Sequence, residues 1–317
     1  MDKNPAVRIG GAVAKGAKKS LGTIWFLLRI MVPTSLAVAL LGWSGLLDHI
    51  ARFLSPLMKL IGLPGEAALV FISASLLNNY SAIAVMGSLS LTMRDATILA
   101  LMSLTAHNLI VETSVMKSAG SSALKMVLLR IGMAIVAALV LNLLLPDSLR
   151  EVIFSAGLSA DKNRFLPMLA DWGLSSLRTV VKVSIFVLFI MIIQSLLEEF
   201  KVIDILSKIM APFMKIFGLP EKASFLWIVI NIVGYAYGAG IIKSEYDRGG
   251  FKKQEGDLFN HHAAISHSLL EDSILYAGIG IGLFWLIVPR LVLATIVVWI
   301  ERFRRSHFKK SFRVGTV

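Results

Sequence analysis

The chain has 317 residues, of which 56% are hydrophobic, and its mean hydropathy is +0.76. Several apolar windows of about 20 residues are long enough to cross a bilayer as helices, so the sequence predicts a polytopic membrane protein. The lack of cysteine excludes disulfides, thiolate metal ligands and cysteine nucleophiles. The net charge of +12 is explained by lysines and arginines that orient membrane helices, so we expect no nucleic-acid partner.

The first elements are a basic tail, a spanning helix and an amphipathic helix. Residues 1–19 are basic and predict a cytoplasmic tail, and residues 21–43 form the first predicted spanning helix. In residues 46–61, charged and polar side chains recur at spacings of 3 and 4 with apolar residues between them. This pattern is typical of a helix that lies in the membrane interface. A Gly-Leu-Pro sequence at 62–64 is expected to end it.

Polar residues interrupt the next two apolar segments. Residues 66–91 carry Asn-Asn-Tyr-Ser at positions 78–81, which fits either one broken span or a re-entrant hairpin with these residues at its tip. The next apolar run, 96–115, contains His107 and Glu112. A turn rich in glycine and serine follows, and a further predicted span covers 126–145.

The second half of the chain repeats the first. Residues 204–220 match residues 48–64 at seven of seventeen positions, where unrelated sequences would share about one, so this is an internal repeat. A predicted span at 174–197 precedes this match, and a second broken segment at 223–242 follows it.

The polar interruption is repeated as well. Residues 267–273 align with residues 107–113 at an offset of 160, and Arg290 aligns with Arg130 at the same offset. Polar or ionisable groups at membrane depth are costly, and they normally face a partner or a solute pathway. We therefore expect the two interruptions to meet in one buried site.

We predict an all-α polytopic membrane protein made of two inverted repeats. Each repeat has an N-terminal spanning helix, an interfacial helix, a re-entrant hairpin and two further spanning helices. The predicted units are a tail at 1–19, repeat 1 at 20–146, a connector at 147–171, repeat 2 at 172–303 and a basic cytoplasmic tail at 304–317.

The topology depends on whether the broken segments re-enter the membrane. If they do, each repeat crosses three times, the repeats are inverted, and 21 lysines and arginines lie inside against 6 outside. If the segments cross fully, the repeats are parallel and the count is 19 to 8. The positive-inside rule favours inversion, with both termini cytoplasmic in a bacterial-type inner membrane.

This arrangement resembles the nucleoside-recognition or Gate domain, with 46–145 and 202–301 as two fused copies. That domain occurs in concentrative nucleoside transporters, in the membrane part of the bacterial ferrous-iron permease and in the spore-maturation membrane proteins. The chain lacks the Gly-Gln-Thr-Glu-Ala-Pro type tip of the nucleoside transporters. It also lacks the GTPase domain and the gate cysteine of the iron permease. It therefore looks most similar to stand-alone, spore-maturation-like members.

The repeat and this resemblance together define the candidate site residues. Those expected to bind a solute are Asn78, Asn79, Tyr80, Ser81, His107, Asn108, Thr113, Asn231, Tyr235, Tyr237, His267, Ser268 and Ser273. Those expected to hold a coupling cation, Na⁺ or H⁺, are Glu112, Glu271 and Asp272, with Arg130 and Arg290 as charge partners.

The two histidines have three interpretations. They fix helix packing, they relay protons with their carboxylates, or His107, Glu112, His267 and Asp272 hold a divalent metal. A spacing of five residues suits joint ligation only if the helix is unwound. His261 and His262 are expected to face the membrane interface.

These residues predict a secondary transporter or facilitator of a small polar solute, nucleoside-like in chemistry and cation-coupled, that binds near the midplane between the repeats. The alternatives are a divalent-metal permease and a non-transporting membrane scaffold. We find no catalytic motif, so we predict no enzyme and no cofactor beyond the coupling ion. The expected partners are the solute and the lipid bilayer. The sequence allows either a monomer or a homo-oligomer.

Overall fold

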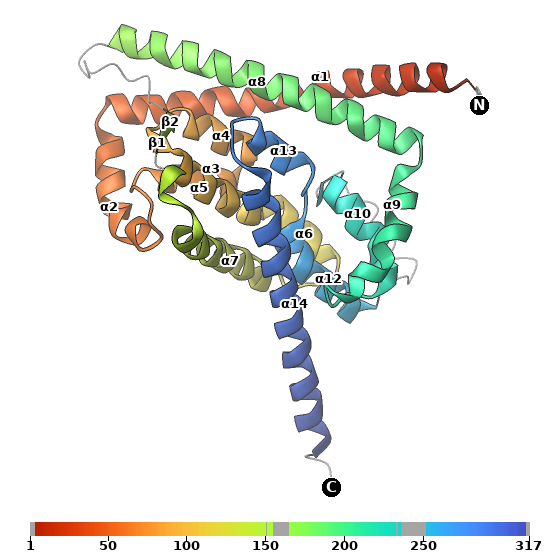
Figure 1. The fold of residues 1–317 in the computed structure, drawn as a ribbon. Helices are drawn as coiled ribbons and strands as arrows, with labels where there is room; N and C mark the ends of the chain where they lie inside the picture. The colour runs from red at the N-terminus through yellow and green to blue at the C-terminus, as the bar shows by residue number, and fades with distance from the viewer. Residues whose placement is uncertain (1–3, 150, 155–164, 233, 236–251, 315–317) are drawn as a thin grey trace.

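The computed structural model describes residues 4–149, 151–154, 165–232, 234–235 and 252–314. Helices dominate this part of the chain (Figure 1). Within it, four helical stretches are long and apolar enough to cross a membrane, namely Met93–Ser118, Ala123–Leu144, Phe165–Glu199 and Leu283–His307. Large apolar side chains lie exposed on these stretches, for example Leu143, Phe189 and Ile300. The protein is therefore an all-α membrane protein, as predicted.

The two longest helices, α1 (Pro5–Trp43) and α8 (Phe165–Glu199), pack side by side along one edge of the molecule (Figure 1). They run antiparallel. Arg8 near the start of α1 pairs with Glu199 at the end of α8, with 2.8 Å between Nε and Oε1. At the opposite ends, the rings of Trp43 and Phe165 lie 5.2 Å apart. The predicted spans 21–43 and 174–197 fall inside these helices.

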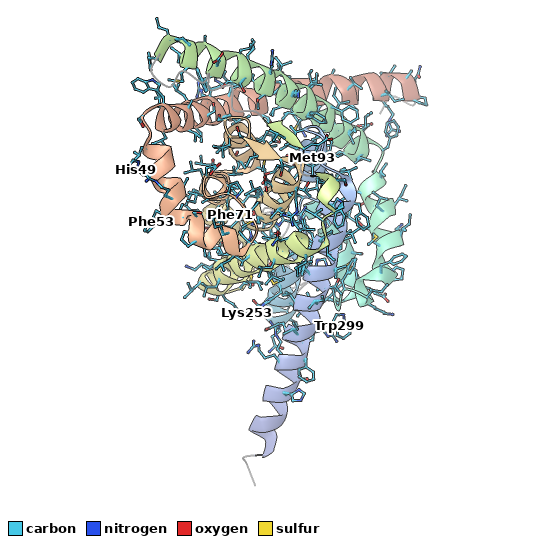
Figure 2. All side chains as sticks on the ribbon, turned by 60° about the vertical axis from the view of Figure 1, so that its left-hand side comes forward. His49, Phe53, Phe71, Met93, Lys253 and Trp299 are labelled. Atoms are coloured by element: carbon cyan, nitrogen blue, oxygen red, sulfur yellow. The ribbon has the colours of Figure 1, made fainter. Side chains whose placement is uncertain are left out.

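Two shorter amphipathic helices follow α1 and α8, namely α2 (Leu46–Leu60) and α9 (Val202–Met210), the latter extended by the 3₁₀ helix η2 (Ala211–Lys215). They lie on opposite sides of the helical core in both views (Figures 1 and 2). Each carries an exposed apolar stripe on one face. The two stripes consist of Phe53, Leu57 and Leu60 in the first half and Ile209, Phe213 and Ile216 in the second. Such stripes are typical of helices that lie in a membrane interface.

The Gly-Leu-Pro sequences end these amphipathic segments in the same way. Gly62 and Gly218 adopt left-handed φ values of 76° and 71°. The amide after each glycine donates to the carbonyl five residues earlier. Leu63 N–H donates to Met58 at 3.0 Å, and Leu219 N–H donates to Met214 at 2.8 Å. Glycine adopts this conformation without a steric penalty.

The first broken segment forms two short helices, α3 (Ala67–Leu76) and α4 (Asn79–Met86), which pack against each other. Asn78 between them is extended, and its side chain accepts a hydrogen bond from Ser81 N–H at 2.9 Å. Helices of 10 and 8 residues span only about 15 and 12 Å, well short of a bilayer. Neither helix alone is therefore long enough to cross a bilayer, and the break at Asn78 separates the two. In the second half, the 3₁₀ helix η3 (Glu221–Ala223) and α10 (Ser224–Ile232) form the first arm.

The predicted connector contributes a small sheet that the sequence analysis did not predict. A 3₁₀ helix, η1 (Asp147–Leu149), precedes β2 (Val152–Phe154), which pairs antiparallel with β1 (Leu91–Thr92). Leu91 lies opposite Phe154, and Thr92 lies opposite Val152. Thr92 also caps the following helix in a capping box with Asp95. The sheet therefore ties the connector to the start of the first polar helix.

The polar helices are both interrupted. The first consists of α5 (Met93–Ala106) and α6 (Leu109–Ser118), followed by α7 (Ala123–Leu144). The second consists of α12 (Lys253–Ser266) and α13 (Glu271–Ala277), followed by α14 (Leu283–Val314). Helix α5 packs on α7, and α12 packs on α14. Figure 1 places the interrupted helices in the middle of the molecule, between α2 and α9, and shows the end of α14 projecting from it.

Candidate functional site

Each interrupted helix breaks at a histidine followed by a left-handed residue. His107 is extended with φ −76° and ψ 162°, and Asn108 then adopts φ 46° and ψ 42°. In the second half, His267 has φ −81° and ψ 165°, and Ser268 has φ 52°. A left-handed conformation costs a residue with a side chain about 1–2 kcal/mol, so tertiary contacts must hold both breaks open.

The first arm of each broken segment supplies one of those contacts. Asn108 N–H donates to the Ala74 carbonyl of α3 at 2.9 Å, and Ser268 N–H donates to the Ile230 carbonyl of α10 at 2.9 Å. Asn231 adds two further acceptors, because its side-chain oxygen and its carbonyl accept the N–H groups of residues 269 and 270. Non-helical backbone inside a membrane protein must be satisfied in this way.

A buried arginine caps the carbonyl end of each break. Arg130 of α7 donates to the carbonyls of Thr105 at 3.0 Å and His107 at 2.8 Å. Arg290 of α14 donates to the carbonyl of Ile265 at 3.0 Å and to the carbonyl of His267. The last carbonyls of a helix have no partner inside it, and they favour a cation. Both arginine side chains are fully buried.

The two breaks bring both imidazoles and two carboxylates together. Nε2 of His107 lies 3.4 Å from Nε2 of His267 and 3.2 Å from Oε1 of Glu112. Glu112 Oε2 lies 3.1 Å from Nε2 of His267 and 2.7 Å from the Arg130 guanidinium. Oδ2 of Asp272 lies 3.4 Å from Nε2 of His107. All of these groups are buried.

The break between His107 and Glu112 overcomes the unfavourable five-residue spacing, because it turns the two side chains toward each other. In the second half the carboxylates pair across the repeats. Asp272 contacts His107, and Oε1 of Glu271 accepts a 3.4 Å hydrogen bond from the Tyr80 hydroxyl of α4. His267 instead meets Glu112 of the first repeat, with 3.1 Å between Nε2 and Oε2.

The start of α4 reaches the second interrupted helix. Besides the contact of Tyr80, the Tyr276 hydroxyl of α13 donates to the side-chain oxygen of Asn79 at 3.2 Å. In the second half, Tyr235 donates to the side chain of Asn260 at 2.7 Å, and its ring lies 5.7 Å from that of His267. These contacts come from both halves of the chain and link the first broken segment and Tyr235 to the second interrupted helix.

Several buried polar atoms in this region find no hydrogen-bond partner among the described residues. They are the hydroxyls of Ser81, Thr113 and Ser273, the side-chain nitrogen of Asn79, and one terminal nitrogen of each buried arginine. Buried polar groups are nearly always hydrogen-bonded, so a cluster of such atoms is typical of a binding site. Thr113 and Ser273 occupy matching positions in the two repeats.

The sequence matches the family model described as "Nucleoside recognition", the Gate domain, over residues 24–123 and 180–297. The chain belongs to the Gate family. It is also 29% identical over 284 residues to the uncharacterized membrane protein YvoD of Bacillus subtilis (strain 168), covering 89% of this chain and 91% of that protein. No solved structure matches the chain.

The sequence analysis did not predict two buried polar residues of this Gate-family protein. Asn260 in α12 donates to the Met116 carbonyl at 3.1 Å and to the hydroxyl of Ser121 at 2.9 Å. Gln194 in α8 donates to the Ile232 carbonyl at 2.8 Å. Their only sequence signal is an amide in an apolar or buried helix. Tyr237, a predicted site residue, lies outside the described residues.

The prediction that His261 and His262 face the interface is wrong, because both side chains are buried in the Gate-family fold. His262 shares a 2.7 Å hydrogen bond with Ser266, and its ring lies 4.8 Å from that of Phe217. His261 lies 3.9 Å from oxygens of Asp257 and of Glu301.

In this second group both acids pair with cations, whereas in the central group Arg130 pairs with Glu112. Arg305 contacts both Asp257 and Glu301, and Lys125 lies 3.2 Å from a Glu301 oxygen. The hydroxyl of Ser121 donates to Asp257 at 2.6 Å. The group therefore connects the turn before α7 to α12 and α14, at one end of the molecule.

Proposed function

We propose that this protein is a secondary transporter or facilitator of a small polar solute, which binds where the two interrupted helices meet. The observation that carries this proposal is the buried cluster of polar groups at matching helix breaks, several of them without partners among the described residues. Such breaks at membrane depth are typical of transporter binding sites. Membership of a family described by nucleoside recognition supports a nucleoside-like solute.

The proposed architecture is a pair of inverted repeats. The matching helices α1 and α8 run antiparallel, and the matching interfacial helices α2 and α9 lie on opposite sides of the core. Helices that occupy opposite interfaces of one bilayer are expected only if the repeats are inverted. The positive-inside rule then places both termini in the cytoplasm of a bacterial-type inner membrane. Transport would proceed as one repeat rocks against the other around the site.

Within the site, neutral and charged groups have separate proposed roles. Ser81, Thr113 and Ser273 have hydroxyls available to hydrogen-bond a polar solute. Glu112 and Asp272 lie close to the imidazoles and would hold the coupling cation. Because the two acids come from opposite repeats, the affinity for the cation would depend on the relative position of the repeats.

The test begins with a thermal-shift screen of the purified protein against nucleosides and amino-acid derivatives, because a ligand that prefers the folded state raises the apparent melting temperature. Uptake of the selected solute into proteoliposomes is then measured. We expect Glu112→Gln combined with Asp272→Asn to abolish uptake, and the control Glu255→Gln, at the start of α12, to retain it. Full uptake by the double variant would remove the coupling role.

Solvent access to the buried site distinguishes a transporter from a non-transporting scaffold. We expect the variants Ser81→Cys and Ser268→Cys to react with small aqueous thiol reagents in the membrane-embedded protein, and the solute to slow this reaction. If neither thiol reacts in any condition that supports folding, the interior is sealed and the transport proposal fails.

A further inference from the structure

We infer that the central cluster binds a divalent transition-metal ion, coordinated by His107, His267 and Glu112, with Asp272 beside these ligands at 3.4 Å from His107. This inference rests on the proposed function, because it names the cation that the same site would take. It replaces Na⁺ or a proton with an ion of the Zn²⁺, Fe²⁺ or Mn²⁺ class. The argument has four parts: ligand geometry, ligand orientation, donor chemistry and comparison with the second acidic group.

The ligand atoms have the separations that a small ion requires. A tetrahedral ion with bonds of about 2.0–2.1 Å holds neighbouring ligand atoms about 3.3 Å apart. The pair of Nε2 atoms is separated by 3.4 Å, and His107 Nε2 lies 3.2 Å from Glu112 and 3.4 Å from Asp272. His267 Nε2 lies 3.1 Å from Glu112. A central ion could therefore contact ligands from both repeats with little rearrangement.

The two imidazoles are held in the orientation that metal binding needs. Nδ1 of His107 lies 3.1 Å from the Ser103 carbonyl, and Nδ1 of His267 lies 2.7 Å from the Ala263 carbonyl. A carbonyl only accepts, so each neutral ring carries its hydrogen on Nδ1 and directs the lone pair of Nε2 at the centre. The two ring nitrogens thus face the two carboxylates as acceptors, an arrangement that a cation bound among them would stabilise.

The donor set selects the kind of cation. Na⁺, Mg²⁺ and Ca²⁺ prefer oxygen ligands, whereas imidazole nitrogen suits Zn²⁺, Fe²⁺ and related ions. The Glu112 carboxylate supplies an anionic oxygen ligand beside the two imidazoles. The Arg130 guanidinium, 2.7 Å from Glu112 Oε2, would orient that ligand from outside the coordination shell.

The second buried group of a histidine and two acids shows the contrast. His261, Asp257 and Glu301 also lie close together, but Lys125 and Arg305 pair with both carboxylates of this group, whereas in the central cluster Arg130 pairs with Glu112. No further cation is needed there. That group therefore provides the matched control.

The test is metal binding by the full-length chain, purified without a histidine tag and stripped with a chelator. Equilibrium dialysis against Zn²⁺, Mn²⁺ or Co²⁺, with the metal measured by mass spectrometry, should give a single ion per chain. Co²⁺ should develop the intense visible absorption of a tetrahedral site. His107→Ala combined with His267→Ala should weaken binding at least about 100-fold, while His261→Ala should bind like the wild type.

Size-exclusion chromatography checks that each variant is folded. If the double variant is not folded, the single variants His107→Gln and His267→Gln replace it in the metal-binding assay. Wild-type protein that takes up no stoichiometric metal would overturn the inference, as would a folded double variant that still binds. Uptake of a polar solute in the presence of chelator, together with absent metal binding, would leave the proposed function standing without the metal. Metal binding without any solute uptake would support the metal site and contradict the proposed transport function.

Discussion

The buried arginine at the first helix break offers the sharpest test of how the break is held. Arg130→Met keeps much of the side-chain volume but removes the guanidinium, which bonds the carbonyls of Thr105 and His107 and pairs with Glu112 at 2.7 Å. Leaving a buried carboxylate without its partner costs about 3–5 kcal/mol. Each unpaired carbonyl adds about 1–3 kcal/mol. Because these losses are not additive, we expect the free energy of unfolding to fall by about 4–8 kcal/mol.

A second substitution separates the two contributions. Adding Glu112→Gln to Arg130→Met removes the stranded charge and should recover about 2–4 kcal/mol, with the carbonyl loss remaining. Arg8→Met is the control, because its ion pair with Glu199 is almost as short, at 2.8 Å, but both side chains are about 40% exposed. That change should cost no more than about 1 kcal/mol.

The measurement is reversible unfolding of the purified protein in bicelles, followed by tryptophan fluorescence. An Arg130→Met variant within about 1 kcal/mol of the wild type would refute the view that this arginine holds the break. A double variant no more stable than the single one would show that the ion pair with Glu112 contributes little, and that the carbonyl bonds dominate.

Three further predictions concern backbone and packing. Asn108→Gly should be tolerated within about 1 kcal/mol and Asn108→Val should cost about 1–2 kcal/mol more in the same unfolding assay, because only glycine adopts a left-handed φ freely. Gly16→Ala should separate α1 from α8 and lower the melting temperature, since its Cβ would meet the Ile192 backbone at 2.6 Å. Gly10→Ala, with open space around it, should instead stabilise the helix by about 0.5–1 kcal/mol. Asp257→Asn should weaken the contacts of Arg305 and speed hydrogen exchange at the start of α12; unchanged exchange would contradict a connecting role for this group.

The sequence alone predicted the long apolar helices, the amphipathic helices and the positions of the breaks. Spans and amphipathic helices are visible because apolar length and periodicity are local properties. The repeat is visible in the Gly-Leu-Pro sequences, whose glycines adopt the same left-handed turn. The polar interruptions at His107 and His267 located both helix breaks. These features depend on a few neighbouring residues, so one sequence suffices to find them.

Only the tertiary structure decided which groups meet. The spacing within each repeat suggested that every histidine pairs with the acid five residues later, yet Glu112 contacts both imidazoles and Asp272 reaches across to His107. The short sheet between residues 91–92 and 152–154, like the burial of His261, was equally invisible in the sequence. These outcomes are set by how the two halves cross, which depends on contacts between residues far apart in the chain, and local pattern carries no information about such contacts.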